Sequence, residues 1–206
     1  MSSGMGDAKL VRFLQQECSR LQDEKQLLLD EAHALRRYIR ALQDLQETVH
    51  RFTPEQDILA LLGETLICAM RLLDTVDGSL MLIDEESDEL VFVLVHGTVG
   101  EMLVGHRFNR RKGIAGWAAE HAEPVIVNNV HTDTRFFPEL DERVDFETRS
   151  LIAMPLVARG RVLGVIEVIN KRSGEKFTDD DASLLAILAA LSASALDYAS
   201  TAEGAG

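Results

Sequence analysis

The sequence predicts an α+β domain built on an antiparallel sheet, preceded by a long N-terminal coiled-coil helix. Three observations predict this architecture. Leucines recur every seven residues in the first fifty positions, two pairs of short β-rich runs indicate hairpins, and an amphipathic helix flanks the remaining chain at each end. Hairpins join neighbouring antiparallel strands. Terminal helices can cover one face of such a sheet, which leaves the other face for a ligand pocket.

The heptad pattern predicts a coiled-coil dimerisation helix over residues 7–52. Position d holds Leu14, Leu21, Leu28, Leu35 and Leu42, and position a holds Val11, Cys18, Lys25, Ala32, Ile39 and Gln46. A sustained seven-residue repeat favours a left-handed supercoil, and polar residues at position a disfavour higher oligomers. We therefore expect a parallel homodimer in which Cys18 faces its partner as a small buried filler. The alternative is an amphipathic helix folded back on its own domain.

A second region, residues 53–199, has the pattern of a globular domain. Thr53, Pro54 and Gln56 form a helix start signal, with a capping residue, a first-turn proline and a capping-box partner. The stripe that follows contains Ile58, Leu62, Leu66, Met70 and Leu73. Beyond it we expect strands at 78–84, 90–96, 104–108, 124–127, 150–157 and 162–170, a short helix at 113–121, a long polar loop at 128–147, and a final helix from Thr178 to Tyr198.

Composition excludes several classes of protein. The net charge of −13 argues against nucleic acid as the main partner, because phosphate binding needs clustered basic residues. The two cysteines, Cys18 and Cys68, have no zinc-ligand spacing, so we expect no metal site and a reducing, cytoplasmic location. The longest apolar run, Leu184 to Leu196, is too short to span a bilayer and contains two serines, so we expect no membrane insertion.

Three segments carry a family resemblance. They are GIAGWAAEHAEPVIVNNVHTDTRF, FETRSLIAMPLVARGRVLGVIEVINK and FTDDD, and together they resemble GAF domains over about residues 54–198. The resemblance implies a six-stranded antiparallel sheet with helices on one side and a small-ligand pocket on the other. It also implies a sensor role in signalling without catalysis, with the state passed through the dimer to an output domain or a separate output protein.

Within that family, the sequence is most similar to the cyclic-nucleotide-binding type of phosphodiesterases and cyclases. The signature of that type, Asn-Lys followed by Phe-x-x-x-Asp-Glu, is matched by Asn170, Lys171, Phe177 and Asp181, while Ala182 replaces the final Glu. The resemblance implies an ion pair between Lys171 and Asp181 that holds the pocket region. It implies cyclic AMP or cyclic GMP as ligand, contacted by Ile114, Ala115, Phe136, Phe137, Thr148 and Glu167.

The residues give independent support for a phosphate site. The segment Gly113 to Gly116 opens a predicted helix with small residues, so its amides can face an anion. Arg110, Arg111 and Lys112 add positive charge before it, and the two phenylalanines can stack on a purine. Each feature also has a structural explanation: the glycines can serve a turn and close packing, the basic triplet a solvated surface, and the phenylalanines a closed pocket.

Three other functions stay open at this stage. The first is a structural dimerisation module without a ligand. The second is an enzyme of the methionine sulfoxide reductase type, against which the absence of any cysteine after Cys68 argues. The third is a haem sensor, with an axial ligand drawn from His96, His106, His121 or His131.

Overall fold

The computed structural model describes residues 12–29, 58–98 and 100–203, together with positions 32, 35, 36 and 39. The chain divides into two compact units, residues 1–43 and 44–206. The predicted boundary between coiled coil and domain, at residues 52 and 53, lies outside the described residues, as does the capping signal at Thr53.

In the first unit, residues 12–29 form a continuous α-helix, and positions 32, 35, 36 and 39 are also helical. Leu14, Leu21 and Leu28, which the heptad places on one seam, are each more than half exposed. The predicted helix therefore agrees with the structure over these residues. Pairing with a second chain stays a prediction, and the heptad positions Val11, Leu42 and Gln46 lie outside the described residues.

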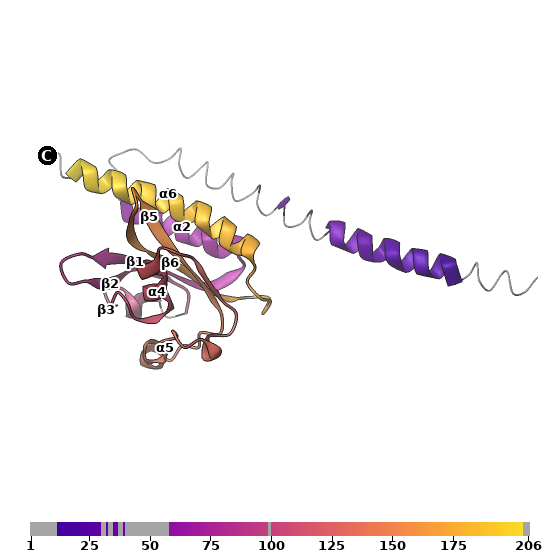
Figure 1. Ribbon diagram of the computed structural model, residues 1–206, viewed down its shortest axis with the longest axis horizontal. Helices are drawn as coiled ribbons and strands as arrows, with labels where there is room; N and C mark the ends of the chain where they lie inside the picture. The colour runs from indigo at the N-terminus through magenta and orange to yellow at the C-terminus, as the bar shows by residue number, and fades with distance from the viewer. Residues whose placement is uncertain are drawn as a thin grey trace, which may run out of the picture. The chain divides into compact units, whose positions relative to one another are not determined.

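The second unit is organised around a six-stranded sheet, in which every pair of neighbours is antiparallel (Figure 1). The strand order is β3-β2-β1-β6-β5-β4. The strands are β1 (Thr75–Asp84), β2 (Glu89–His96), β3 (Arg107–Asn109), β4 (Val125–Val127), β5 (Leu151–Ala158) and β6 (Arg161–Lys171). This confirms the predicted sheet: β1 and β2 form one hairpin, β5 and β6 the other, and pairing of β1 with β6 joins them.

Two long helices cover one face of the sheet, α2 (Ile58–Leu72) and α6 (Asp179–Glu203) (Figure 1). Leu66 of α2 and Leu185 of α6 are fully buried there against strand residues such as Ile166. We call this side the helix face. Burial of such side chains contributes about 1.5–3 kcal/mol each, so this layer supplies much of the stability of the domain.

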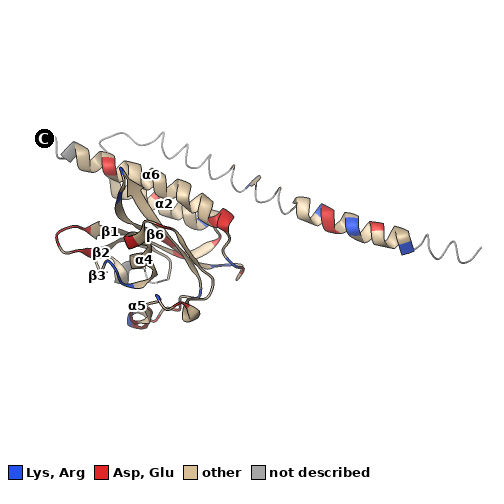
Figure 2. Ribbon diagram, in the orientation of Figure 1, with Lys and Arg blue, Asp and Glu red and all other residues tan. Residues whose placement is uncertain are grey.

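The helix α6 is unusually apolar, and Figure 2 shows charged residues only near its two ends. Within the described residues, its segment Asp179–Thr201 is the one helix whose length and composition would suffice to cross a membrane. Leu185, Leu188 and Ala193 of this helix are nevertheless buried against α2 and the sheet. One face of α6 therefore belongs to the core, whereas Ile187, Leu191 and Tyr198 of the same helix are exposed.

The opposite side of the sheet, which we call the pocket face, carries three short helices and a 3₁₀ turn. These are α3 (Gly100–Leu103), α4 (Gly113–His121), η1 (Val130–Thr132) and α5 (Pro138–Val144). A second apolar cluster lies under them and includes Met81, Ile114 and Leu151. Because strand side chains alternate between faces, residues next to each other in sequence belong to different layers. In β6, Ile166 and Val168 meet the helices, whereas Val165 lies on the pocket face.

Two predicted elements differ from the structure. The expected strand at 104–108 begins only at Arg107, as the three-residue strand β3, because residues 104 and 105 form a turn after α3. The expected polar loop at 128–147 contains η1 and α5. Pro138 suits the first turn of α5, Glu139 and Asp141 favour its positive end, and Val144 is buried, so this polar segment folds as a short helix.

Candidate functional site

A pocket opens on the pocket face, between the middle strands of the sheet and the helices α3, α4 and α5. The pocket and its mouth together hold about 760 Å³ free of protein atoms, part of which is open solvent. All six residues that the sequence analysis named as ligand contacts lie in its lining: Ile114, Ala115, Phe136, Phe137, Thr148 and Glu167.

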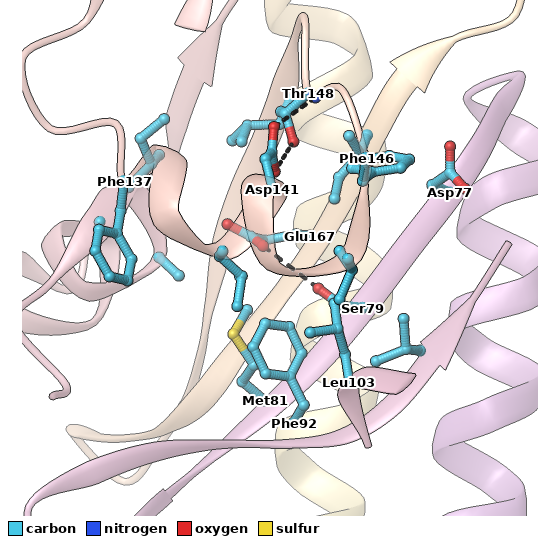
Figure 3. Close-up of a pocket in the computed structure, with 18 of the residues that line it drawn as sticks. Asp77, Ser79, Met81, Phe92, Leu103, Phe137, Asp141, Phe146, Thr148 and Glu167 are labelled. Atoms are coloured by element: carbon cyan, nitrogen blue, oxygen red, sulfur yellow. Dashed lines mark hydrogen bonds between the residues drawn. The ribbon is translucent and has the colours of Figure 1, made fainter. Parts of the chain in front are cut away.

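Glu167 lies at the centre of the pocket (Figure 3). It follows Ile166 in β6, so alternation directs its side chain away from the helices and into the pocket. Ser79, opposite it on β1, donates a hydrogen bond from Oγ to Oε2 at 3.3 Å. The pKa of Glu167 is raised to about 7. Burial is the main cause, the Ser79 hydrogen bond lowers the pKa, and the nearby Asp141 carboxylate raises it.

Thr148 is held in the pocket wall by Asp141 of α5. The Thr148 amide donates to Asp141 Oδ2 at 2.7 Å, and its hydroxyl donates to Oδ1 at 2.9 Å. Figure 3 shows this pair beside Glu167. Sequence reasoning missed Asp141 because residues 128–147 were assigned to a loop and no motif marks this residue.

The start of α4 forms another wall. Gly113 adopts a positive φ of 77°, and a Cβ on Gly116 would lie 2.6 Å from the carbonyl carbon of Arg111, so both positions require glycine. The N-cap residue, Lys112, makes no side-chain capping hydrogen bond. The first amides of this nine-residue helix, including those of Ile114 and Ala115, are therefore left for solvent or a ligand.

The basic triplet contributes only one side chain to the pocket. Arg110 pairs with Asp88 at 3.1 Å, and Arg111 pairs with Glu120 at 3.5 Å, both outside the lining. Lys112 does line the pocket, where its Nζ lies 3.5 Å from the centre of the Phe137 ring. A cation over an aromatic face is attracted by the ring quadrupole. Lys112 Nζ also lies 3.9 Å from Glu139 Oε1, so the expected positive field reduces to the start of α4 and one lysine that has a carboxylate partner.

Carboxylates outnumber lysines and arginines in the lining. Asp77, Asp141 and Glu167 line the pocket, against Lys112 and the partly buried His96. Sequence reasoning named only Glu167 of these acids. Asp77 and Ser79 alternate with Gly78 and Leu80 along β1, and this period of two is the signal that could have placed them on the pocket face.

The Asn-Lys and Phe-Asp signature lies beside the pocket and outside its lining. Lys171 Nζ and Asp181 Oδ2 lie 2.7 Å apart, and the same oxygen accepts a hydrogen bond from the Thr178 amide at the start of α6. Asn170 accepts from the Arg149 amide at 2.8 Å and donates to the Glu147 carbonyl at 2.8 Å. This asparagine therefore attaches the segment that carries Thr148 to β6.

A second asparagine performs a similar task. Asn128, just after β4, accepts a hydrogen bond from the Phe177 amide at 2.6 Å and donates to the Phe177 carbonyl at 3.1 Å. The Phe177 side chain is buried in the helix-face core. Residues of the signature thus connect loops, sheet and α6, and their contacts form a frame beside the pocket.

The residues proposed for other chemistries are dispersed. Cys68 lies on α2 and packs against the helix-face core, on the other side of the sheet from the pocket. Among the histidines considered for haem, His96 lines the pocket in the described part of the chain, whereas the others contact aromatic rings: His106 with Phe92, His121 with Trp117 and His131 with Phe136. The described residues contain no cluster suited to a metal ion.

The chain folds as an α+β domain with a pocket on one face of its sheet, and comparison with known proteins identifies its family. A family model described as "GAF domain" matches residues 53–197. The chain belongs to the GAF domain family, as its sequence motifs indicated.

The most similar relatives include cyclic phosphodiesterases. A "Probable 3′,5′-cyclic phosphodiesterase pde-5" of Caenorhabditis elegans is 31% identical over 140 residues, which cover 64% of this chain and 19% of that protein. The "Dual 3′,5′-cyclic-AMP and -GMP phosphodiesterase 11A" of Takifugu rubripes is 43% identical over 76 residues, which cover 36% of this chain and 8% of that protein. The match therefore spans a fifth or less of these relatives.

Solved structures agree on the fold. The GAF domain from a phosphoenolpyruvate-protein phosphotransferase of Coxiella burnetii superimposes with a TM-score of 0.71 at 20% identity, covering 84% of this chain and 99% of that one. A free methionine-R-sulfoxide reductase of Neisseria meningitidis, solved with its substrate, gives a TM-score of 0.60 at 25% identity, covering 71% of this chain and 81% of that one.

Proposed function

We propose that this GAF domain is a non-catalytic regulatory module that binds a cyclic nucleotide, cyclic AMP or cyclic GMP, in the pocket. One observation carries the proposal: the uncapped start of α4 and the buried polar groups around Glu167 line the same pocket. The first can bind a phosphate and the second can accept hydrogen bonds from the sugar or base. Similarity to cyclic phosphodiesterases supports this chemistry.

In this arrangement the amides of Ile114 and Ala115 hold the cyclic phosphate, helped by Lys112. The Phe136 and Phe137 rings supply apolar surface for the purine, and Thr148 and Glu167 contact the rest of the nucleotide. The ion pair of Lys171 with Asp181 keeps the frame in place without touching the ligand. Each role is a proposal that rests on the pocket lining and on the family motifs.

Binding is tested by calorimetric titration and thermal shift of the full chain with cyclic AMP, cyclic GMP and cyclic dinucleotides. Thr148→Val removes a pocket hydroxyl at nearly constant shape. The matched control is Thr65→Val, because Thr65 is equally buried but lies on α2, where its hydroxyl donates to the Leu61 carbonyl. We expect Thr148→Val to weaken binding about tenfold and Thr65→Val to leave it unchanged. The proposal is refuted if neither cyclic AMP nor cyclic GMP binds, whether or not a cyclic dinucleotide does.

We also propose that the chain acts as a parallel homodimer through the heptad helix, and that the dimer passes the ligand state to an output domain or a separate output protein. The exposed seam of Leu14, Leu21 and Leu28 supports the pairing, since a lone helix leaves that apolar surface in water. A ligand shifts such a dimer only if it binds two states with different affinity. A ligand-dependent change in spacing between spin labels on the two chains tests transmission.

The dimer itself is tested through Cys18, which is exposed and occupies heptad position a. In a parallel, in-register pair the two Cys18 side chains lie opposite each other, so mild oxidation should cross-link the chains. Cys18→Ser should abolish the cross-link and leave the dimer intact in sedimentation. Leu21→Asp should dissociate it. A monomer at micromolar concentration would contradict the proposal.

A further inference from the structure

Three carboxylates from three different elements face the same pocket. Asp77 lies on β1, Asp141 on α5 and Glu167 on β6, and all three belong to the lining. Asp77 is 6% exposed and Glu167 is 8% exposed, so water screens their charges poorly. Figure 3 shows Asp141 beside Glu167. A ligand that enters the pocket therefore meets a concentration of acidic groups.

The hydrogen-bond partner of Glu167 differs in kind from those of the two aspartates. Asp77 and Asp141 each accept a hydrogen bond from a backbone amide at 2.7 Å, and an amide N–H can only donate, which suits an ionised carboxylate. Glu167 instead accepts from the Ser79 hydroxyl at 3.3 Å. A hydroxyl can donate or accept, so it suits the ionised and the protonated acid alike. Glu167 is therefore the pocket acid that can take up a proton and keep its partner.

The charged groups around Glu167 offer little to offset a further anion. In the described part of the chain, the other titratable side chains of the lining are Asp77 from β1, His96 from β2, Lys112 from just before α4 and Asp141 from α5. The strand β5 places the apolar Ala153 opposite Glu167. Lys112 already has a carboxylate partner, Glu139, at 3.9 Å. An arriving anion therefore adds to an excess of negative charge.

A bound nucleotide should change how firmly Glu167 holds a proton. Burial places the pKa of this group at about 7 in the free protein, so both of its forms are present near neutral pH. A cyclic nucleotide carries a negative charge on its phosphate, and a like charge in a poorly screened pocket favours the neutral form of a carboxyl group. The pKa of Glu167 should therefore rise further in the complex. By linkage, binding then takes up a proton, and the affinity falls as the pH rises above that of half-titration in the free protein.

We propose that the pocket binds a cyclic nucleotide together with a proton, which passes from solvent to Glu167, and that the protonated Glu167 donates a hydrogen bond to the nucleotide. While Ser79 donates to Oε2, the proton on Oε1 is available to the ligand. The inference rests on the proposed function, because the charge of the nucleotide drives the proton uptake. It makes the module sensitive to pH, since occupancy at a fixed nucleotide concentration increases as the pH falls through neutrality.

The first test is calorimetric titration of the unaltered full chain with cyclic AMP and cyclic GMP at pH 6.5 and pH 8.5. The charge of the cyclic phosphate is constant over this range, and we expect the affinity to be about tenfold lower at pH 8.5. Titrations at pH 8 in buffers of different ionisation enthalpy count the protons exchanged, and they should show uptake of roughly half a proton per nucleotide. Equal affinities at the two pH values, or release of protons, would overturn the inference.

The second test is Glu167→Gln, because glutamine replaces the protonated acid with an amide that donates a hydrogen bond and does not titrate. This variant should bind equally tightly at both pH values and take up no proton. The matched control is His96→Gln, since histidine is the other type of side chain in the lining that titrates near neutral pH. Whatever its effect on affinity, this control should keep the dependence on pH.

The outcomes separate this inference from the proposed function. If neither nucleotide binds at either pH, both fail together, whereas binding that is independent of pH refutes this inference alone. It is also refuted if Glu167→Gln keeps the pH dependence, or if this variant folds but binds nothing, because an ionised carboxylate is then required. Thermal melts report folding. If Glu167→Gln does not fold, His96→Gln decides, since loss of the pH dependence there would assign the proton to His96.

Discussion

The two faces of the sheet are made by the same strands and yet differ in kind. On the helix face, Leu80, Ile166 and Val168 meet α2 and α6 in a layer of apolar side chains. None of these three residues lines the pocket. On the pocket face, the intervening residues Ser79 and Glu167 are polar, buried and arranged around a pocket. Successive side chains of a strand point to opposite faces of the sheet, so one residue can pack in the apolar core while its neighbour lines the pocket.

The difference shows how a small domain can hold an energetically unfavourable site. Burial of Glu167 raises its pKa, which means that the folded state disfavours the charged form. A tightly packed helix face can offset that cost, because fully buried leucines and isoleucines contribute most of the burial energy. The following changes probe this division, from the largest expected effect to the smallest.

The largest effect is expected on the helix face. Ile166 lies on β6, which pairs with β1 and β5, and its side chain is fully buried. Ile166→Ala should lower the free energy of unfolding by about 4 kcal/mol. Leu103→Ala removes a similar volume from the pocket lining, where the vacated space joins the existing pocket, so we expect about 2 kcal/mol. Urea unfolding at pH 7 measures both. Equal losses would break the contrast between the faces.

Glu167 offers a pH-dependent test of the pocket face. The pKa of Glu167 is about 7 in the folded state and 4.5 by its ordinary value. Between these two pH values Glu167 is therefore protonated in the folded state and ionised in the unfolded state. Stability from this group therefore falls as the pH rises through that window and is lowest above pH 7. Glu167→Gln should raise the free energy of unfolding at pH 8 by on the order of 3 kcal/mol, and by almost nothing at pH 4.

The matched control for that experiment is Glu64→Gln, since Glu64 is exposed on α2 and lies outside the pocket. The difference between the two variants should depend on pH, as measured by urea unfolding from pH 4 to 8. A Glu167→Gln variant that is no more stable at pH 8 than at pH 4, relative to this control, would contradict the raised pKa.

Asn170 connects the pocket loop to the sheet. Asn170→Ala loses its hydrogen bonds to the Arg149 amide and the Glu147 carbonyl, and alanine is strained at the φ of +55° found here. We expect a loss of about 2 kcal/mol in unfolding free energy. Asn170→Gly, which relieves only the strain, should recover part of it. Faster amide hydrogen exchange at residues 147–150 would identify the loosened segment, and unchanged exchange would contradict the role.

The smallest effect is expected where strand and helix meet at the edge of the two layers. Asp181→Asn removes the charge partner of Lys171 but can keep the hydrogen bond from the Thr178 amide. Because both side chains are largely buried, the loss should be about 1 kcal/mol, more than for an exposed ion pair. The exposed pair of Arg149 with Glu147 is the comparison, and Arg149→Met should change the melting temperature very little.

Much of the fold followed from local patterns. The hairpins β1–β2 and β5–β6, the helix α4 and the covering helix α6 were predicted close to their positions in the structure, because alternation and helical stripes act over a few residues. The short helix α5 was missed. Its sequence, PELDERV, has too few apolar residues for a stripe. Its one buried residue, Val144, packs in the pocket-face cluster, and these contacts come from segments distant in sequence.

The pocket was recognised in part. Glu167 and Thr148 came from family motifs, whereas Asp77, Ser79 and Asp141 carried no motif and emerged only when β1 and α5 were placed around the pocket. Conversely, Arg110 and Arg111 suggested positive charge at the site, but their partners Asp88 and Glu120 direct them elsewhere. Ion pairs between distant segments cannot be predicted from the spacing of the basic residues alone.

The sequence by itself therefore determined the α+β class, the two hairpins, the family and the heptad seam, since each depends on residue periodicity or on a contiguous motif. The tertiary structure alone decided the raised pKa of Glu167 and the meeting of three carboxylates in one pocket. Desolvation and Coulomb interactions depend on distance through space, and the groups involved come from β1, α5 and β6, which are far apart along the chain.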